Sequence, residues 1–327
     1  NELSQILAPI ALDFKALDEV IRLRLASKVA LIDQISTYII QAGGKRVRPA
    51  LLLLVSKALA NGKETPHALE LAAVVEFIHT ATLLHDDVVD ESTLRRGRET
   101  ANAAFGNAAS VLVGDFLYSR AFQMMVGPND LRVMEILSDA TNTIAEGEVL
   151  QLLNMNDPEV DEESYLQVIR YKTAKLFEAS TELGAILANA TEAQREQAAA
   201  FGRHIGTAFQ LMDDVIDLQP SGKSSGKTAG TDLRAGVPTL PVLLLRKKAE
   251  TDAAARELLV KIDGDLTSDE SLAAVVDALA HNDVTAEAHT EAKRWAEKAV
   301  NALAPLPASS VKDALVTFAE AVVDRNQ

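Results

Sequence analysis

Cysteine is absent from this 327-residue chain. Without it the chain has no disulfide bond, no thiolate ligand for a metal ion and no cysteine nucleophile. Aromatic residues are also scarce, at 4%, whereas hydrophobic residues make up 48% and charged residues 24% of the sequence. This composition is ordinary for a globular protein with a sizeable core, and it is unlike that of a disordered chain.

Positive charge is in deficit, because 47 acidic residues outnumber 32 Lys and Arg residues and leave a formal net charge of -15. Nucleic-acid binding needs a basic surface, so this balance argues against nucleic acid as a partner. Long apolar runs are missing too: the stretch from Pro49 to Val55 is too short to span a bilayer, and no basic segment with a cleavage site precedes it. We therefore expect a soluble, cytoplasmic protein without a transmembrane segment.

Alternation of apolar and polar residues, the pattern of half-buried strands, is rare. Apolar residues instead recur at helical spacing in long stretches rich in Ala, Leu and Glu, which predicts an all-α fold. No linker or low-complexity tract divides the chain, so we expect a single domain over residues 1–327. The predicted helices cover Ala8 to Leu25, Lys28 to Gln41, Pro49 to Ala60, Pro66 to Asp90, Ala108 to Val126, Leu131 to Leu153, Asp161 to Asn189, Glu192 to Leu218 and several segments after Thr239.

One acidic pattern occurs twice, as LLHDDVVD ending at Asp90 and as QLMDDVID ending at Asp217. Each places three Asp residues in an otherwise apolar run, where an unpaired charge is costly to bury. On a helix the first and last Asp of each set lie four residues apart on one face, Asp86 with Asp90 and Asp213 with Asp217. Carboxylates on a rigid helix suit Mg²⁺ held jointly with substrate phosphates, so the two stretches predict a metal clamp.

Basic residues lie near the acidic stretches in the sequence, and two interpretations of them stay open. They are either counter-ions of the carboxylates or oxyanion ligands, since Arg binds phosphate through two hydrogen bonds and glycines let backbone N–H groups approach an anion. These cations are Lys45, Arg46 and Arg48 in QAGGKRVRP, Arg95, Arg96 and Arg98 in ESTLRRGRE, Lys172 beside Thr173 in YKTAKLF, and Lys223 and Lys227 in SGKSSGKTAG.

The cations include two that fall in the polar loop from Ser221 to Pro241, which is long enough to predict a functional lid or a disordered segment. His79 lies on the same helix face as Asp86, two turns earlier. Spacing alone does not decide whether His79 is a core residue or part of a site.

Five segments in this order and spacing resemble the trans-isoprenyl diphosphate synthases, or polyprenyl synthetases, particularly the long-chain bacterial members of octaprenyl type. They are GGKRVRP, HTATLLHDDVVDESTLRRG, KTAKLFE, FQLMDDVID and GKTAGTDLRAGVPTLP, and the likeness spans about Ser36 to Leu245. The resemblance implies a prenyltransferase with an isoprenoid-synthase-type helical bundle around a deep central cavity, usually a homodimer, with a flexible lid loop at about 221–238.

The resemblance also assigns site residues, position by position. Two to three Mg²⁺ ions are expected on the metal ligands Asp86, Asp90, Asp213 and Asp217. Isopentenyl diphosphate is expected to contact Lys45, Arg48, His79 and Arg96, and the allylic diphosphate to contact Arg95, Lys172, Gln210 and Lys227. The residues expected to act directly in catalysis are Asp86, Asp90, Lys172, Thr173, Gln210 and Asp213.

In the implied reaction, the cations and Mg²⁺ stabilise the departing pyrophosphate and lower the barrier to ionising the allylic C–O bond. The backbone carbonyl of Thr173 and the side-chain oxygen of Gln210 face the carbocation. The double bond of isopentenyl diphosphate attacks it, and a proton is lost to the released pyrophosphate. The product is longer by one isoprene unit, remains allylic and can react again.

Chain length is expected to follow cavity depth. Bulky residues before the first acidic motif block the cavity in short-chain members, whereas the small Ala81 and Thr82 leave room here. The floor is expected among Phe122, Met124, Met125 and Leu137. We expect a heptaprenyl to decaprenyl product, with octaprenyl as the central expectation, that serves as a quinone side chain and leaves by contact with a membrane surface.

One position departs from the family pattern, because Val237 stands where many members have Lys in GKPTLP. A diphosphate contact is therefore expected to be missing from the lid. A short-chain farnesyl or geranylgeranyl diphosphate synthase is the main alternative.

Three more distant classes of protein share part of this pattern and fit the rest of it less well. A terpene cyclase normally has a mixed Asn, Ser and Glu second metal site rather than a second DDxxD. An HD-type phosphohydrolase, suggested by His85 next to Asp86, needs several metal-binding histidines. A non-enzymatic partner subunit of a heterodimeric synthase typically loses the acidic motifs, and both are intact here.

Overall fold

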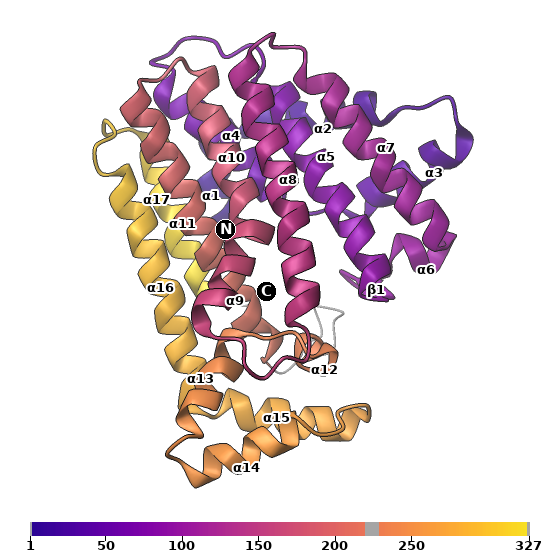
Figure 1. Cartoon of the computed structure of the whole chain (residues 1–327). Coiled ribbons are helices and arrows are strands. Elements are labelled where there is room, and N and C mark those ends of the chain that lie inside the picture. Colours follow the sequence, from indigo (N-terminus) through magenta and orange to yellow (C-terminus); the bar gives the residue numbers. More distant parts are fainter. Residues whose placement is uncertain (1, 220–228, 326–327) are drawn as a thin grey trace. The chain divides into compact units, whose positions relative to one another are not determined.

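A computed structural model describes residues 2–219 and 229–325, and these residues are almost entirely helical (Figure 1). The prediction of an all-α fold is confirmed. Within the described ranges the only strands are the two-residue β1 (Leu94–Arg95) and β2 (Arg98–Glu99), which pair antiparallel. The sequence pattern did not predict this hairpin.

The helices agree with the predicted ones to within a few residues at most ends. The first group is α1 (Glu2–Leu7), the 3-10 helix η1 (Ala8–Ile10), α2 (Ala11–Leu25), α3 (Ala30–Ala42), α4 (Val47–Leu59), α5 (Ala68–Val89), α6 (Ala101–Phe105) and α7 (Asn107–Met125). The second group is α8 (Leu131–Asn154), α9 (Glu162–Ile169), the π-helix η2 (Arg170–Ala174), α10 (Lys175–Leu187) and α11 (Glu192–Asp217). The last group is α12 (Thr231–Ala235), α13 (Leu240–Lys248), α14 (Ala253–Ile262), α15 (Asp269–Ala280), α16 (Asp283–Leu303) and α17 (Ser310–Asp324).

One predicted helix is wrong in its continuity. The segment from Asp161 to Asn189 is not a single α-helix, because the π-helical η2 interrupts it between α9 and α10. A π-helix adds a residue to the turn, so the side chains that follow it are rotated relative to those before it. Lys172 and Thr173 lie in this interruption.

Contacts within the chain group it into two compact units. The first combines Asn1–Thr141, Leu176–Gly202 and Ala302–Phe318, and the second combines Asn142–Lys175, Arg203–Asn301 and Ala319–Gln327. Both units draw on segments that are distant in the sequence. A single domain over residues 1–327 stays a prediction.

Helix α5 is central to the first unit, where it packs against α2, α4 and α7 (Figure 1). Residues 71–75 are completely buried, as are their neighbours Phe77 and Ile78 at 0 to 1% exposure. By length and hydropathy α5 also qualifies as a membrane span, but 56% of the qualifying window is buried inside the protein. A helix that is apolar on nearly all sides and packed on several neighbours has the character of a core helix.

In the second unit, the C-terminal half of helix α11 likewise contributes buried apolar side chains to the core. Leu211, Met212 and Val215 on the helix, and Leu218 directly after it, are at most 4% exposed. Their spacing leaves Asp213 and Asp217 on the partly exposed side of the helix. The core of each unit therefore fixes the direction in which its acidic motif points.

Candidate active site

The first acidic motif lies where α5 ends. Asp90 is the residue that caps α5, and its backbone N–H still donates to the carbonyl of Asp86 at 2.7 Å, so the helical spacing of the two carboxylates is kept. Asp90 is exposed and Asp86 partly exposed, whereas Asp87 is only 4% exposed. The motif therefore offers its first and last carboxylates outward and directs the middle one into the protein.

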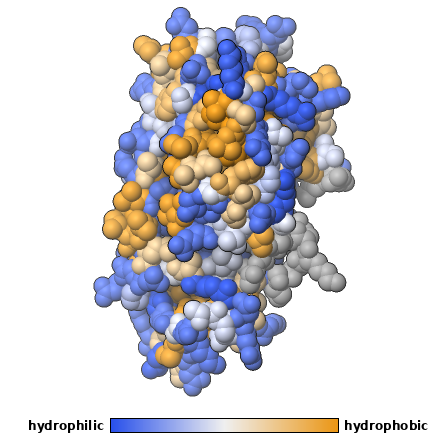
Figure 2. All heavy atoms as spheres, turned by 90° about the vertical axis from the view of Figure 1, so that its right-hand side faces the viewer, coloured by the Kyte–Doolittle hydropathy of each residue, from blue (hydrophilic) through white to orange (hydrophobic). Residues whose placement is uncertain are grey.

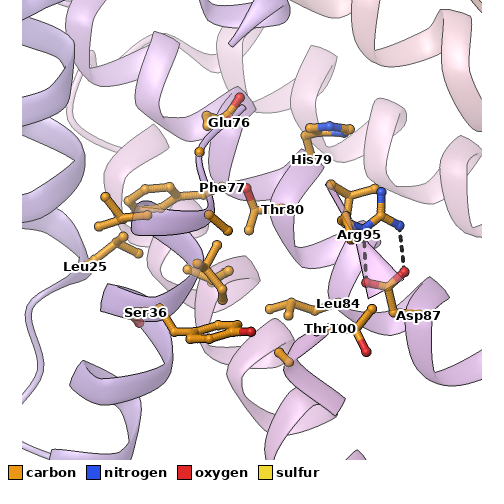
Figure 3. Close-up of a pocket in the computed structure, with 18 of the residues that line it drawn as sticks. Leu25, Ser36, Glu76, Phe77, His79, Thr80, Leu84, Asp87, Arg95 and Thr100 are labelled. Carbon is orange, nitrogen blue, oxygen red and sulfur yellow. Dashed lines mark hydrogen bonds and ion pairs between the residues drawn. The ribbon is translucent and has the colours of Figure 1, made fainter. Parts of the chain in front are cut away.

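Asp87 has a specific partner on the hairpin that follows α5. Arg95 donates from Nε to Oδ2 at 3.1 Å and from Nη2 to Oδ1 at 2.6 Å, a two-point contact drawn in Figure 3. The hairpin returns to the helix because the N–H of Ser92 donates to the carbonyl of Asp87 at 2.9 Å. Of the two interpretations that the sequence allows, this geometry gives Arg95 the role of counter-ion to Asp87, while its side chain stays 37% exposed.

The glycine-rich turn before α4 meets the same hairpin. Arg96, which has a positive φ of 51°, donates from Nη1 to the carbonyl of Gly43. A Cβ at Gly44 would lie 3.0 Å from that guanidinium group, so a side chain there would crowd Arg96. Arg46 forms an ion pair with Asp18, and Lys45 is exposed. The two basic segments predicted to hold one diphosphate are thus adjacent.

His79 lies in this cationic region. Arg48 Nη1 is 3.3 Å from His79 Nε2, and the Arg48 guanidinium lies 4.5 Å from the ring centre of Phe177. Burial, with Arg48 and then Arg95 and Arg96 adding to it, holds the pKa of His79 well below its usual value. The imidazole is therefore neutral, and a ring that accepts from Arg48 at Nε2 carries its proton on Nδ1.

A largely apolar cavity of about 100 Å³ adjoins these residues (Figure 3). Its wall includes His79, Arg95 and Arg96 together with Leu25, Leu84 and other apolar side chains. Glu76 also lines it, and burial raises the pKa of this carboxyl although Arg48, Arg46 and Arg96 act in the opposite direction. The sequence did not single out Glu76, because one acid on an apolar helix carries no pattern.

The second acidic motif has a partner from the C-terminal end of the chain. Arg325 Nη2 lies 2.6 Å from Asp213 Oδ1, and the same atom donates to the carbonyl of Phe209 at 2.6 Å. The guanidinium also lies 3.9 Å from the ring centre of Phe209. Asp213 keeps 42% of its side chain exposed. Sequence reasoning missed Arg325, which is 112 residues from Asp213 and belongs to no motif.

Asp217 is the last Asp of the same motif, and it accepts hydrogen bonds from the segment that begins at Gly230. The N–H of Gly230 donates to the carbonyl of Asp217 at 2.7 Å, and the N–H of Asp232 lies 3.3 Å from Asp217 Oδ2. Val237 is partly buried, and its N–H donates to the carbonyl of Asp232 at 3.0 Å. The predicted contacts from Lys223 and Lys227 lie outside the described residues.

The π-helix η2 and α11 share a polar network. Lys172 Nζ lies 3.2 Å from Glu148 Oε2 and also donates to Gln151 Oε1. Thr173 Oγ1 donates to Gln210 Oε1 at 3.0 Å. Three residues predicted to act on the allylic substrate, Lys172, Thr173 and Gln210, are therefore placed by α8, η2 and α11 within one unit.

The network continues to Asp214, the middle acid of the second motif. Gln210 Nε2 donates to Asp214 Oδ1 at 3.0 Å, and the hydroxyl of Tyr165 donates to Asp214 Oδ2. Burial, together with nearby Asp232, raises the pKa of Asp214 well above its usual value, and burial beside Asp214 raises the pKa of Tyr165. The sequence did not predict Tyr165, which is 49 residues from Asp214.

The residues predicted to set chain length lie on α5. Ala81 has no exposed surface, whereas Thr82 is partly exposed and donates from Oγ1 to the carbonyl of His79 at 2.6 Å. Among the predicted floor residues, Met124, Met125 and Leu137 are buried, but Phe122 is 43% exposed. Phe122 is therefore the weakest of these floor candidates.

The outward residues of the acidic motifs fit Mg²⁺ by their chemistry, since they offer carboxylate oxygens. In the described part of the chain, no three His, Cys, Asp or Glu side chains form a ready-made metal cage. Such a set suits an ion that takes one or two carboxylates from the protein and completes its shell with substrate phosphate and water. His85 contacts α7, with Nε2 3.0 Å from the carbonyl of Val111.

Comparisons with known proteins agree with one another. A sequence model of the polyprenyl synthetase family matches residues 29–279. The octaprenyl diphosphate synthase of Haemophilus influenzae is 48% identical over 316 residues, covering 96% of this chain and 94% of that protein. The octaprenyl diphosphate synthase of Escherichia coli is 45% identical over 317 residues, covering 97% of both. A polyprenyl synthase from Caulobacter crescentus, crystallised with calcium and isoprenyl diphosphate, has a TM-score of 0.93 at 38% identity, covering 99% of this chain and 98% of that one.

Proposed function

Because this chain belongs to the polyprenyl synthetase family, we propose that it is a Mg²⁺-dependent, all-trans polyprenyl diphosphate synthase with an octaprenyl product. It is a prenyltransferase of the isoprenoid pathway with the all-α fold of the polyprenyl synthases. One observation carries the long-chain proposal: relatives at 45 to 48% identity over nearly the whole chain are octaprenyl diphosphate synthases. We further propose the product as the precursor of a quinone side chain.

We assign the metal ligands to the outward carboxylates, Asp86 and Asp90 on α5 and Asp213 and Asp217 on α11. Two to three Mg²⁺ ions held there with the diphosphate would supply the positive charge that stabilises the leaving pyrophosphate. Arg325 contacts Oδ1 of Asp213 at 2.6 Å, but the carboxylate has a second oxygen and 42% of the side chain is exposed, so the contact does not exclude a metal ion. Arg95, Lys172 and Lys227 are assigned to the allylic diphosphate.

Isopentenyl diphosphate is assigned to the basic region of the first unit, where Lys45, Arg48, His79 and Arg96 would hold its diphosphate. The neutral His79 contributes a hydrogen bond rather than a charge, and the guanidinium groups provide the charge and the two-point geometry. The carbocation is assigned to acceptors in the second unit, the backbone carbonyl of Thr173 and Oε1 of Gln210. These atoms oppose the developing positive charge, as preorganised dipoles do in other enzymes.

His79 offers a test of the isopentenyl diphosphate assignment. His79→Ala is expected to raise the KM for isopentenyl diphosphate by roughly 10-fold, the effect of losing one hydrogen bond to a charged group. His79→Gln retains a neutral donor and is expected to stay within about threefold of the original KM. Steady-state kinetics with each substrate varied in turn checks this, and the KM for the allylic substrate serves as the internal control. Equal damage from both substitutions would show that the imidazole itself is required.

Thr82 offers a test of the chain-length assignment. Thr82→Phe is expected to shorten the main product, because Thr82 is the partly exposed member of the pair before the first motif. Ala81→Phe is expected to act in the same direction but with a lower melting temperature, since Ala81 is fully packed. Sizing of the dephosphorylated products checks both. Thr82→Val, which loses the hydroxyl but not the volume, is the control, and an unchanged product from Thr82→Phe would place the floor elsewhere.

We propose that the protein is a cytoplasmic homodimer with one domain per chain, and that it contacts a membrane surface only to release product. The dimer is supported by apolar side chains on α7 and at its C-terminal end, where Val111, Leu112, Phe122 and Val126 are 36 to 65% exposed. Figure 2 views the side of the molecule that carries α3 and α7 and shows apolar side chains gathered there. Patches of this kind mark interaction sites. Sedimentation equilibrium of purified protein would reveal a monomer if the proposal is wrong.

The central experiment is incubation of the protein with Mg²⁺, labelled isopentenyl diphosphate and farnesyl diphosphate, followed by sizing of the prenyl alcohols. We expect a ladder that ends at octaprenol. No elongation would reject the synthase function. A ladder that ends at the first addition, at twenty carbons, would favour the short-chain alternative and reject only the proposed length.

A further inference from the structure

Asp214 and Tyr165 form a buried pair beneath the residues assigned to the carbocation. Asp214 is 4% exposed and Tyr165 is 5% exposed, and neither side chain belongs to the outward carboxylate set. Tyr165 donates to Asp214 Oδ2, and Gln210 Nε2 donates to Asp214 Oδ1. Because both side chains are buried, bulk water does not compete for these hydrogen bonds, and they strongly favour one arrangement.

Gln210 is the residue that this pair touches on the substrate side. Its amide has an oxygen and an NH₂ group of nearly equal shape, so packing alone does not distinguish the two orientations. Asp214 Oδ1 accepts from Gln210 Nε2 at 3.0 Å, and Oε1 is then left to accept from Thr173 Oγ1 at 3.0 Å. Both oxygens of Asp214 accept here, Oδ2 from Tyr165 and Oδ1 from Gln210, which is the pattern of an ionised carboxylate.

Thr173 does not fix the amide by itself, because a hydroxyl group both donates and accepts and can satisfy either end of Gln210. The carboxyl group of Asp214 can accept only Nε2 at this position. We propose that Asp214, oriented by Tyr165, is a positioning residue that keeps Gln210 Oε1, rather than its NH₂ group, directed toward Thr173 and the substrate. This rests on the proposed function, in which Oε1 of Gln210 stabilises the carbocation.

The chemistry makes the orientation consequential. An amide oxygen presents negative charge to a carbocation, whereas the NH₂ group of a rotated amide presents positive charge at the same place. The two orientations differ little in volume, so the protein's fold would tolerate either one. The middle Asp of the second motif therefore has a different task from its outward neighbours, with Tyr165 as the partner that makes the task possible.

Asp214→Asn is the diagnostic substitution. The Tyr165 hydroxyl donates at this position in the structure, so we expect it to hold the oxygen of the new amide. The NH₂ group of residue 214 then faces Gln210 and repels Nε2, which favours the rotated Gln210. We expect kcat to fall about 100-fold, with the KM for the allylic substrate changed less than about threefold, because only the transition state carries the full charge.

Tyr165→Phe provides the second arm of a double-mutant cycle. Alone it should lower kcat by less than about 10-fold, because Asp214 Oδ1 still accepts from Gln210. Combined with Asp214→Asn it should raise kcat by roughly 10-fold above the Asp214→Asn single variant, since the new amide is then free to turn its oxygen toward Gln210. A merely structural role predicts the reverse, with the double variant at or below the product of the two single effects.

Thr207→Val is the matched control, because it removes a buried hydroxyl that donates to the carbonyl of Arg203 at 2.9 Å on the same helix, three residues before Gln210. Its kcat should match the wild type. Failure of wild-type protein to elongate would reject the proposed function. Wild-type elongation together with an unimpaired Asp214→Asn variant, or with no recovery in the double variant, would reject only the positioning role.

Discussion

Asp86→Ala is expected to lower kcat at least ~100-fold, the scale seen when a key electrostatic stabiliser of a transition state is lost. The melting temperature of the apo protein should change little, because Asp86 is partly exposed at the end of α5 and the helix beneath it is held by apolar packing. Kinetics and thermal melts of the same preparation test the two parts. Near-normal turnover would show that the first acidic stretch is not the metal site.

Asp87→Ala is the matched control, and we expect it to lower the melting temperature of the apo protein. Asp87 is 4% exposed and takes two hydrogen bonds from Arg95, so its loss removes a structural contact. Arg95 is 37% exposed and can reach water, so we expect a stability loss nearer ~1 kcal/mol than the ~3–5 kcal/mol of a fully buried pair. Mg²⁺ with pyrophosphate should raise the melting temperature of Asp87→Ala but not of Asp86→Ala.

The two acidic stretches show what helical periodicity predicts well. Residues four apart share a helix face and adjacent residues are rotated by about 100°, so the outward pairs Asp86 with Asp90 and Asp213 with Asp217 follow from the sequence. The same rotation directs Asp87 and Asp214 inward, and both are 4% exposed. Apolar neighbours in each stretch indicate which direction is inward, and the all-α fold follows from the same pattern.

The partners of the inward acids do not follow from any local pattern. Asp87 meets Arg95 across a hairpin, eight residues along the chain, and Asp214 meets Tyr165, which is 49 residues away. Such contacts depend on how the chain returns to itself, and spacing along a helix carries no information about that. Arg325 is the extreme case, since it reaches Asp213 over 112 residues.

The sequence pattern did not predict the π-helix η2, for a different reason. The apolar spacing before and after residues 170–174 is helical, so a one-residue insertion leaves the pattern readable as one continuous helix. Its effect is local, because it changes the direction of Lys172 and Thr173 without ending the segment. Single-turn π segments are frequent at functional sites. The resemblance to the polyprenyl synthetases identified these two residues, while their backbone geometry came only from the structure.

Gly147→Ala is expected to disrupt the placement of this π-helix. A Cβ at Gly147 would lie 2.7 Å from the backbone nitrogen of Lys172 and 2.9 Å from Cβ of Tyr171, closer than real Cβ atoms come. The obstacle is largely backbone, so α8 or η2 must shift rather than a flexible side chain. A displacement of about 1 Å at a substrate-positioning segment can lower the rate ~100-fold, and we expect a loss of that order in kcat.

The stability change from Gly147→Ala should be much smaller than its kinetic effect. Overpacking lowers the free energy of unfolding by about 1–3 kcal/mol, and the better helix propensity of Ala offsets about 1 kcal/mol of that loss. Ala145→Gly, at an exposed position of α8, is the matched control: it weakens the helix by about 1 kcal/mol but adds no atom near Lys172. If Ala145→Gly and Gly147→Ala lower kcat equally, general weakening of α8 explains both. If only Gly147→Ala does, the close approach of α8 is what holds Lys172 and Thr173 in position for the allylic substrate.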